Sequence, residues 1–127
     1  MRFSFNPNAR LIVVRAHVSG PRGRGDLQLV LDTGASRTLI SEQLLRIAGY
    51  DPHDAVAQGR MTTASGIRSV PVVIVQKLSA LGCERVDLPV VCHTLPSSTA
   101  YDGLLGLDFF RGREIRIDFR NGQIELT

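Results

Sequence analysis

The chain of 127 residues has no tryptophan, a single lysine (Lys77) and no long apolar run. A membrane-spanning helix needs roughly 18 consecutive apolar residues, and no stretch approaches that length. The residues after Arg2 also lack the apolar core of a secretory signal peptide. We therefore expect a cytoplasmic protein without a membrane partner, in which a hydrophobic fraction of 43% fills an ordinary globular core.

Metal-binding and disulfide patterns are missing as well. Cys83 and Cys92 are the only cysteines, and their spacing matches no zinc motif. A structural disulfide is not expected in a reducing compartment. His17, His53 and His93 have no neighbours at metal-ligand spacing, so we expect no metal and no cofactor, and we interpret both cysteines as small core or loop residues.

Positive charge is in modest excess, with a net charge of +3, and it is carried almost entirely by arginine. Arginine suits phosphate, but these residues are scattered and few aromatic side chains accompany them for base stacking. The stretch Ser19–Gly25 is rich in glycine and arginine, yet no Gly-Lys-Ser/Thr follows it. We predict an exposed hairpin loop there and no nucleic-acid partner.

Alternating and short apolar segments predict a mainly β domain with one or two short helices. Ser41 is a suitable N-cap for a helix through Ala48, with Leu44, Leu45 and Ile47 packing inward. Pro89 places its strand near a sheet edge, and Asn121-Gly122 is a favoured two-residue hairpin turn. The predicted strands are 3–5, 11–18, 27–31, 38–40, 56–64, 67–77, 85–93, 115–119 and 123–126.

The most informative stretch is Leu27–Ser36, in which an apolar strand leads directly into Asp32-Thr33-Gly34-Ala35-Ser36. An ionised carboxylate at a strand end is costly unless it accepts hydrogen bonds. The missing side chain of Gly34 permits backbone amides to approach it closely. An ordinary strand ending in an Asx-type turn has the same residues, so this stretch alone leaves both interpretations open.

A second stretch, Tyr101–Phe110, contains two large apolar residues followed by Gly106. We expect a short core strand there, turning sharply into a helix capped by Asp108. Between the two stretches the sequence alternates, turns at Ala64-Ser65-Gly66 and continues as a second apolar strand. A hairpin tip of small residues suits a mobile lid, and it also suits any β-turn.

In this order, strand-Asp-Thr-Gly-Ala, hairpin and Leu104-Leu105-Gly106 resemble the retroviral-like (retropepsin-type) aspartic proteases, in their bacterial and cellular branch. The resemblance covers roughly residues 10 to 127. It implies one domain over residues 1–127, built as a single closed β-barrel-like lobe. It also implies a flap hairpin at about 56–77 and a C-terminal hairpin at 113–127.

The resemblance implies an aspartic endopeptidase, whose chemistry needs two carboxyl groups. Two carboxylates about 3 Å apart cannot both ionise, so one stays protonated while the other takes a proton from water. This chain has one Asp-Thr-Gly and about half the length of a two-lobed enzyme. The second Asp32 would then come from a second copy in a symmetric homodimer that binds an extended peptide.

By the same resemblance, Asp32 is base and acid, Thr33 hydrogen bonds across the two-fold axis, and Gly34 accepts close approach of substrate backbone. Ala35 replaces a hydroxyl residue common in pepsin-like enzymes, which suggests a less acidic pH optimum. The expected substrate-binding residues are Ala35, Ser36, Ala64, Ser65, Gly66 and Ile67, and those expected to support the site structurally are Leu104, Leu105 and Gly106.

Two departures from the retroviral pattern concern the loops around the site. Ser36 and Arg37 stand where many retroviral enzymes have acids, and Leu107-Asp108 replaces Arg-Asn. The Arg-to-acid brace between these loops is therefore absent. We expect the dimer to be held instead by Gln123–Thr127, together with Phe3–Phe5, in an intersubunit sheet.

Two other functions fit parts of the sequence. Actin-like and Hsp70-like ATPases also have Asp-x-Gly-x-Ser/Thr after a strand, as in Asp32–Ser36, but they need several βαβ units, and the pattern after Ser41 is mainly β. The second alternative is a non-catalytic dimerisation or peptide-binding module with the same barrel. The intact Asp32, Thr33 and Gly34 favour an enzyme over that module.

Overall fold

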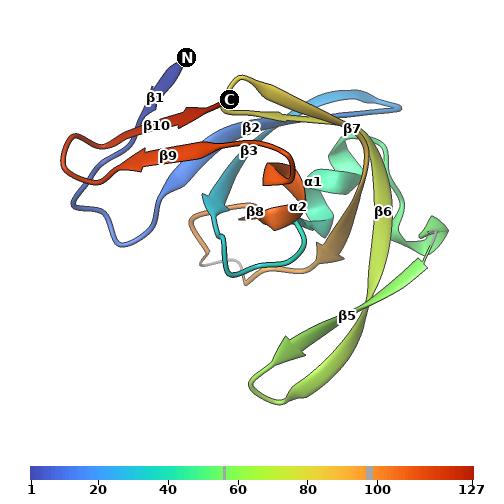
Figure 1. Ribbon diagram of the computed structural model, residues 1–127. Coiled ribbons are helices and arrows are strands. Elements are labelled where there is room, and N and C mark those ends of the chain that lie inside the picture. The colour runs from blue at the N-terminus through green and yellow to red at the C-terminus, as the bar shows by residue number, and fades with distance from the viewer. Residues whose placement is uncertain (56, 97–98) are drawn as a thin grey trace.

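The computed structural model describes residues 1–55, 57–96 and 99–127 (Figure 1). Val56, where the expected flap hairpin begins, and Ser97-Ser98 in the loop before Tyr101 lie outside the described residues. In the rest of the chain, no helix is long and apolar enough to cross a membrane.

Strands dominate the described structure, as the sequence predicts. The two short helices are α1 (Glu42–Ile47) and α2 (Leu107–Phe110), with one 3₁₀ turn, η1 (Pro52–Asp54). The strands are β1 (Arg2–Ser4), β2 (Val13–Gly20), β3 (Gly23–Leu31), β4 (Leu39–Ser41), β5 (Ala57–Thr63), β6 (Gly66–Ala80), β7 (Cys83–His93), β8 (Gly103–Leu105), β9 (Ile115–Asp118) and β10 (Gln123–Leu126).

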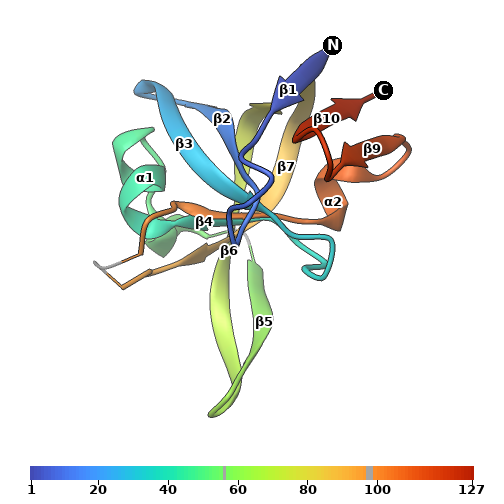
Figure 2. The ribbon, with the colours of Figure 1, turned by 90° about the vertical axis from the view of Figure 1, so that its left-hand side faces the viewer.

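Within the described residues, six strands close into a barrel (Figure 1). They follow the order β2-β3-β8-β4-β7-β6, and β6 pairs again with β2 to complete the ring. β3 and β8 run parallel, as do β4 and β7, whereas β4 and β8 are antiparallel. β5 pairs only with β6 in this part of the chain, so the β5–β6 hairpin projects beyond the barrel (Figure 2).

The barrel interior is filled by alternating apolar residues. In β2, Val14, Ala16 and Val18 are buried while the residues between them face outward, and Leu27 and Leu29 of β3 are 1% and 0% exposed. This two-residue period is what a strand with one buried face requires. Phe109 of α2 is also fully buried in this core.

A second, three-stranded sheet joins the chain ends in the order β1-β10-β9 (Figures 1 and 2). Phe3 pairs with Ile124, which in turn pairs with Ile117. β10 is therefore the central strand, and both of its edges are occupied within one chain.

Two predicted hairpin connections are wrong in length. The loop predicted at Ser19–Gly25 is only the turn Pro21-Arg22, because β2 and β3 pair up to Gly20↔Gly23. Conversely, the two-residue turn predicted at Asn121-Gly122 is a four-residue connection between Asp118 and Gln123. The Asp118 carboxylate accepts hydrogen bonds from the Arg120 and Asn121 N–H groups, which ends β9 one residue early.

β6 and β7 are longer than predicted and meet at the turn Leu81-Gly82. Leu81 has φ 53° and Gly82 has φ 74°. Positive φ at both central residues matches the right-handed twist of the flanking strands, so pairing continues up to Ala80↔Cys83. Among the described strands, residues 83–90 of β7 pair only with β6, which confirms that Pro89 lies in an edge segment.

Helix α1 begins as predicted, because the Ser41 hydroxyl accepts the Leu44 N–H at 3.3 Å. Leu45 is fully buried, but Ile47 is 60% exposed, so its predicted inward packing is wrong. Two residues along an α-helix turn the side chain by about 200°, and Ile47 therefore lies opposite Leu45. Both cysteines are free thiols, and Cys92 is buried.

Candidate active site

Asp32 lies at the carboxyl end of β3, where the barrel strand leaves the sheet. Its N–H donates to the Leu105 carbonyl of the parallel strand β8 at 3.0 Å, and its carbonyl accepts the Ala35 N–H at 3.2 Å. The Gly34 N–H donates to Asp32 Oδ1 at 2.9 Å. The carboxyl group is thus held by its own loop, and Asp32 as a whole is half-buried.

Gly34 gives the carboxyl group the space it occupies. A Cβ at this position would lie 3.1 Å from Asp32 Oδ1, closer than a carbon normally approaches an oxygen. Thr33, Gly34 and Ser36 are exposed, and Ala35 is half-buried. The loop therefore presents Asp32 and its neighbours at the surface of the chain.

Gly106 is where two chain segments cross. A Cβ there would lie 2.6 Å from the carbonyl carbon of Arg37 and 2.9 Å from the Ala35 oxygen. The Leu107 N–H donates to that Ala35 oxygen at 2.8 Å. A side chain at position 106 would push these segments apart, so glycine lets the start of α2 hold the Asp32 loop. Of the residues expected to support the site structurally, Leu105 and Gly106 are buried and Leu104 is half-buried.

A hydroxyl and a carboxylate form a brace between the same two segments. Thr38 is 0% exposed, and its N–H donates to both Asp108 oxygens at 2.9 and 3.0 Å. Its hydroxyl donates to Asp108 Oδ1 at 2.7 Å and accepts the Gly106 N–H at 3.1 Å. Hydrogen bonds to an ionised oxygen are among the stronger ones in proteins.

This brace corrects the predicted role of Asp108. The N-cap of α2 is Gly106, which makes no side-chain capping hydrogen bond, and Asp108 lies inside the first turn. Its carboxylate accepts hydrogen bonds from Thr38 because Thr38, the residue before β4, lies beside α2. Thr38 was not among the candidate residues. In the sequence, the brace is indicated only by a hydroxyl residue after the Asp32 loop and an acid two residues after Gly106.

The other predicted substrate-binding residues lie on the β5–β6 hairpin. Ala64 and Ser65 form its turn, Gly66 adopts φ 126°, and Ile67 is 70% exposed. The predicted site residues therefore fall into two groups, one in the Asp32 and Gly106 loops and one at the end of a projecting hairpin (Figure 2).

One face of this hairpin packs toward the Asp32 loop. Met61 and Val70 belong to a small apolar cluster that includes Leu39 of β4 and Leu104 of β8. Leu104 immediately precedes Leu105, whose carbonyl accepts the Asp32 N–H. We call the region between this hairpin face and the Asp32 loop the candidate cleft.

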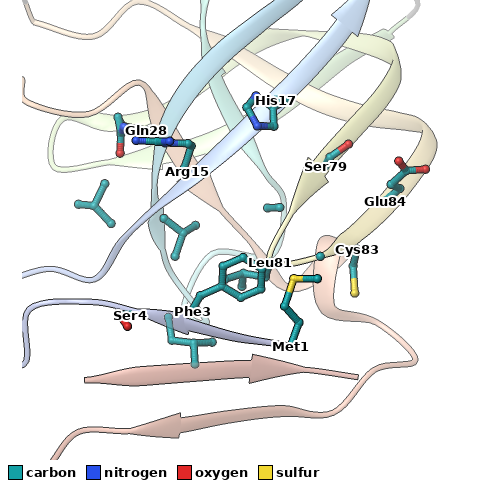
Figure 3. Close-up of a pocket in the computed structure, with 15 residues that line it drawn as sticks. Met1, Phe3, Ser4, Arg15, His17, Gln28, Ser79, Leu81, Cys83 and Glu84 are labelled. Carbon is teal, nitrogen blue, oxygen red and sulfur yellow. The ribbon is translucent and has the colours of Figure 1, made fainter. Parts of the chain in front are cut away.

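The largest described cavity lies elsewhere. It measures about 700 Å³ and is lined by residues from β1, β2, β3, β6, β7 and β10, Phe3, Arg15 and His17 among them (Figure 3). His17 Nδ1 lies 2.6 Å from Asp26 Oδ1. None of the three described cavities is lined by residues of the 32–36 loop.

Comparison with known proteins agrees with this geometry. The structure is similar to that of a retropepsin-like aspartic protease from Rickettsia conorii, with 18% sequence identity and a TM-score of 0.72, over 99% of this chain and 88% of that one. A search of curated proteins found no match. The sequence model of the aspartyl protease family matches residues 14–109, which is more than half of the chain. This chain therefore belongs to the aspartyl protease family and has the retropepsin-like fold.

Proposed function

We propose that this chain is an aspartic endopeptidase that acts as a symmetric homodimer, with one Asp32 from each copy. Family membership makes a protease the expected class. The observation that carries the proposal is the setting of Asp32. Its backbone is tied to β8, its carboxyl group is fixed by Gly34, and its loop is exposed rather than packed under the rest of the chain.

A second copy supplies what one chain lacks. The sequence contains one Asp-Thr-Gly, whereas peptide hydrolysis by this chemistry needs a pair of carboxyl groups sharing one proton. An isologous two-fold contact brings the same loop of each copy to the axis. One Asp32 then takes a proton from the attacking water, and the other donates a hydrogen bond to the scissile carbonyl.

The neighbouring loop residues take supporting roles in this proposal. The exposed Thr33 hydroxyl hydrogen bonds across the axis and holds the two loops together. Gly34, Ala35 and Ser36 line the cleft and meet the substrate backbone. Leu104, Leu105 and Gly106 support the loop from the barrel side, with the Thr38–Asp108 brace fixing its far end.

The β5–β6 hairpin is the proposed flap, spanning about residues 56–77. Its tip, Ala64–Ile67, closes over an extended peptide and adds main-chain hydrogen bonds. In the structure this hairpin projects beyond the barrel (Figure 2). We propose that residues 1–127 act as one such domain, with the C-terminal hairpin within 113–127.

The terminal sheet restricts how two copies can join. β10 has β1 on one edge and β9 on the other. A partner strand therefore cannot pair directly with Gln123–Thr127 while this sheet persists, and it can extend the sheet only at β1 or β9. We keep the terminal strands as the proposed interface, with those two edges as the contact.

A simple assay distinguishes a protease from a non-catalytic peptide-binding module. Wild-type protein and Asp32→Asn are incubated with a mixed peptide library, with and without a statine-type inhibitor. Our proposal predicts cleavage that is abolished by Asp32→Asn and blocked by the inhibitor. Binding without Asp32-dependent cleavage would overturn the proposal in favour of the module.

A further inference from the structure

Two arginines, Arg37 and Arg68, lie beside the candidate cleft. Arg37 follows the Asp32 loop and is exposed. A Cβ placed on Gly59 of β5 would lie 3.5 Å from Arg37 Nη1. The guanidinium group therefore reaches from the Asp32 loop to the hairpin strand, across the side of the cleft.

The register of the hairpin places a second arginine on the same face. Gly59 pairs with Val70, and Met61 pairs with Arg68. Directly paired residues share a face of the sheet, as do residues two apart along one strand. Met61 and Val70 pack toward Leu39 and Leu104, so Arg68 lies on the hairpin face that is turned toward the Asp32 loop.

Arg60 lies on the opposite face of the hairpin from Arg68 and therefore serves as a control. It pairs with Ser69, whose hydroxyl donates to Gln58 Oε1 on the opposite face of the hairpin. Arg60 has the same charge and is also exposed, but it lies on the outer face. The hairpin thus carries Arg60 and Arg68 on opposite faces.

These arginines lack acidic partners in the part of the chain that the structure describes. No carboxylate oxygen there lies within 4.0 Å of the guanidinium nitrogens of Arg37 or Arg68. Arg68 also borders a separate hollow of about 520 Å³, so Arg37 is the better placed of the two. Glu42, which borders the same hollow as Arg68, accepts from Arg46 and Thr94 instead.

We propose that Arg37, with a smaller contribution from Arg68, makes this cleft select extended peptides that carry a glutamate or aspartate side chain near the cleaved bond. This inference rests on the proposed function and names its substrate class. The guanidinium fork matches a carboxylate with two parallel hydrogen bonds. In a symmetric dimer each copy contributes Arg37, so an acid is favoured on both sides of the scissile bond.

The test uses triplets of peptides based on one cleaved sequence, with Glu, Gln or Lys at each position around the bond. Wild-type protein should cleave the best Glu peptide with a kcat/KM roughly two- to five-fold above its Gln counterpart, the size expected for one exposed charge pair, and the Lys peptide should be slower. Raising the salt concentration should reduce the difference, because exposed charges are screened.

Charge reversal identifies the residue responsible. Arg37→Glu should invert the order so that the Lys peptide is cleaved fastest, and Arg68→Glu should reduce the preference for Glu. The matched control Arg60→Glu changes the same charge on the outer face and should leave the order unchanged. Equal cleavage of the Glu and Gln peptides, or an equal effect of Arg60→Glu and Arg37→Glu, would overturn the inference.

A binding measurement separates this inference from the proposed catalysis. If no peptide is cleaved in an Asp32-dependent manner, the protease proposal fails. Fluorescence anisotropy of the same labelled peptides with Asp32→Asn then reports recognition alone. Tighter binding of the Glu peptide, lost in Asp32→Asn/Arg37→Glu, supports the acidic preference, whereas equal binding of all three peptides contradicts it.

Discussion

At the scale of single residues, the shape of the Asp32 loop depends on close contacts and hydrogen bonds made by a few residues. A Cβ at Gly106 would lie 2.6 Å from the Arg37 carbonyl carbon, and a Cβ at Gly34 would lie 3.1 Å from Asp32 Oδ1 and shift the carboxyl group. Thr38 is fixed by its hydrogen bonds, since its hydroxyl is both donor to Asp108 and acceptor from the Gly106 N–H. The geometry of the candidate catalytic acid therefore depends in part on Gly106 and Thr38, which support its loop from the barrel side.

The Thr38 hydroxyl should contribute measurably to stability. Thr38→Val keeps the shape but leaves the buried Gly106 N–H without its acceptor and Asp108 with one donor fewer. We expect a loss of about 2 kcal/mol in the free energy of unfolding. Urea unfolding measures this, and Thr38→Ser, which retains the hydroxyl, should lose less. A Thr38→Val protein as stable as the wild type would show that the brace contributes nothing.

At the scale of elements, the β9–β10 connection is held by one carboxylate. Asp118 accepts the Arg120 N–H at 2.9 Å, the Asn121 N–H at 3.0 Å and the Asn121 amide at 2.8 Å. The Asn121 N–H, followed by the Asn121 side chain, lowers the pKa of Asp118 below its ordinary value of 3.8. Because hydrogen bonds to the charged form lower a pKa, the folded state favours the ionised carboxyl group.

The pH dependence of stability follows from the lowered pKa of Asp118. A lowered pKa in the folded state adds stability above the unfolded pKa, and this stability is lost as the pH falls through the folded pKa. Asp118→Asn should therefore be less stable than the wild type at pH 7, and the difference should shrink below about pH 4. Thermal unfolding at several pH values measures it.

A matched control is available in the same region of the chain. The Glu114 carboxylate lies 3.8 Å from Arg116, and both side chains are exposed. Glu114→Gln should change the melting temperature little at any pH, because loose surface ion pairs contribute little. An Asp118→Asn difference that stays constant or grows in acid would contradict the proposed role of the turn.

The sequence predicts those structural features that are determined by residues close together in the chain. The strand leading to Asp32, the Ser41 cap and the Gly106 turn are local patterns, and all three are confirmed. The turn at Leu81-Gly82 was missed because a leucine with positive φ has no sequence signal and is imposed by the twist of β6 and β7. The Thr38–Asp108 brace joins residues 70 positions apart, so only the fold places them together.

At the scale of the whole molecule, the chain is a closed barrel with a projecting hairpin and a terminal sheet of its own (Figures 1 and 2). Among the described strands, the pairing of β6 with β2 closes the barrel, whereas β1 and β9 of the terminal sheet pair only with β10. In the proposed homodimer, a second copy would supply the other carboxyl group and the other wall of the cleft.

The most direct test of the paired-acid account is cleavage rate against protein concentration, followed together with mass by analytical ultracentrifugation. Activity per chain should fall as the dimer dissociates on dilution. Excess Asp32→Asn protein, by forming mixed dimers with one Asp32, should inhibit the wild type. Full activity per chain in a sample that sediments as a monomer, unaffected by Asp32→Asn, would contradict the account.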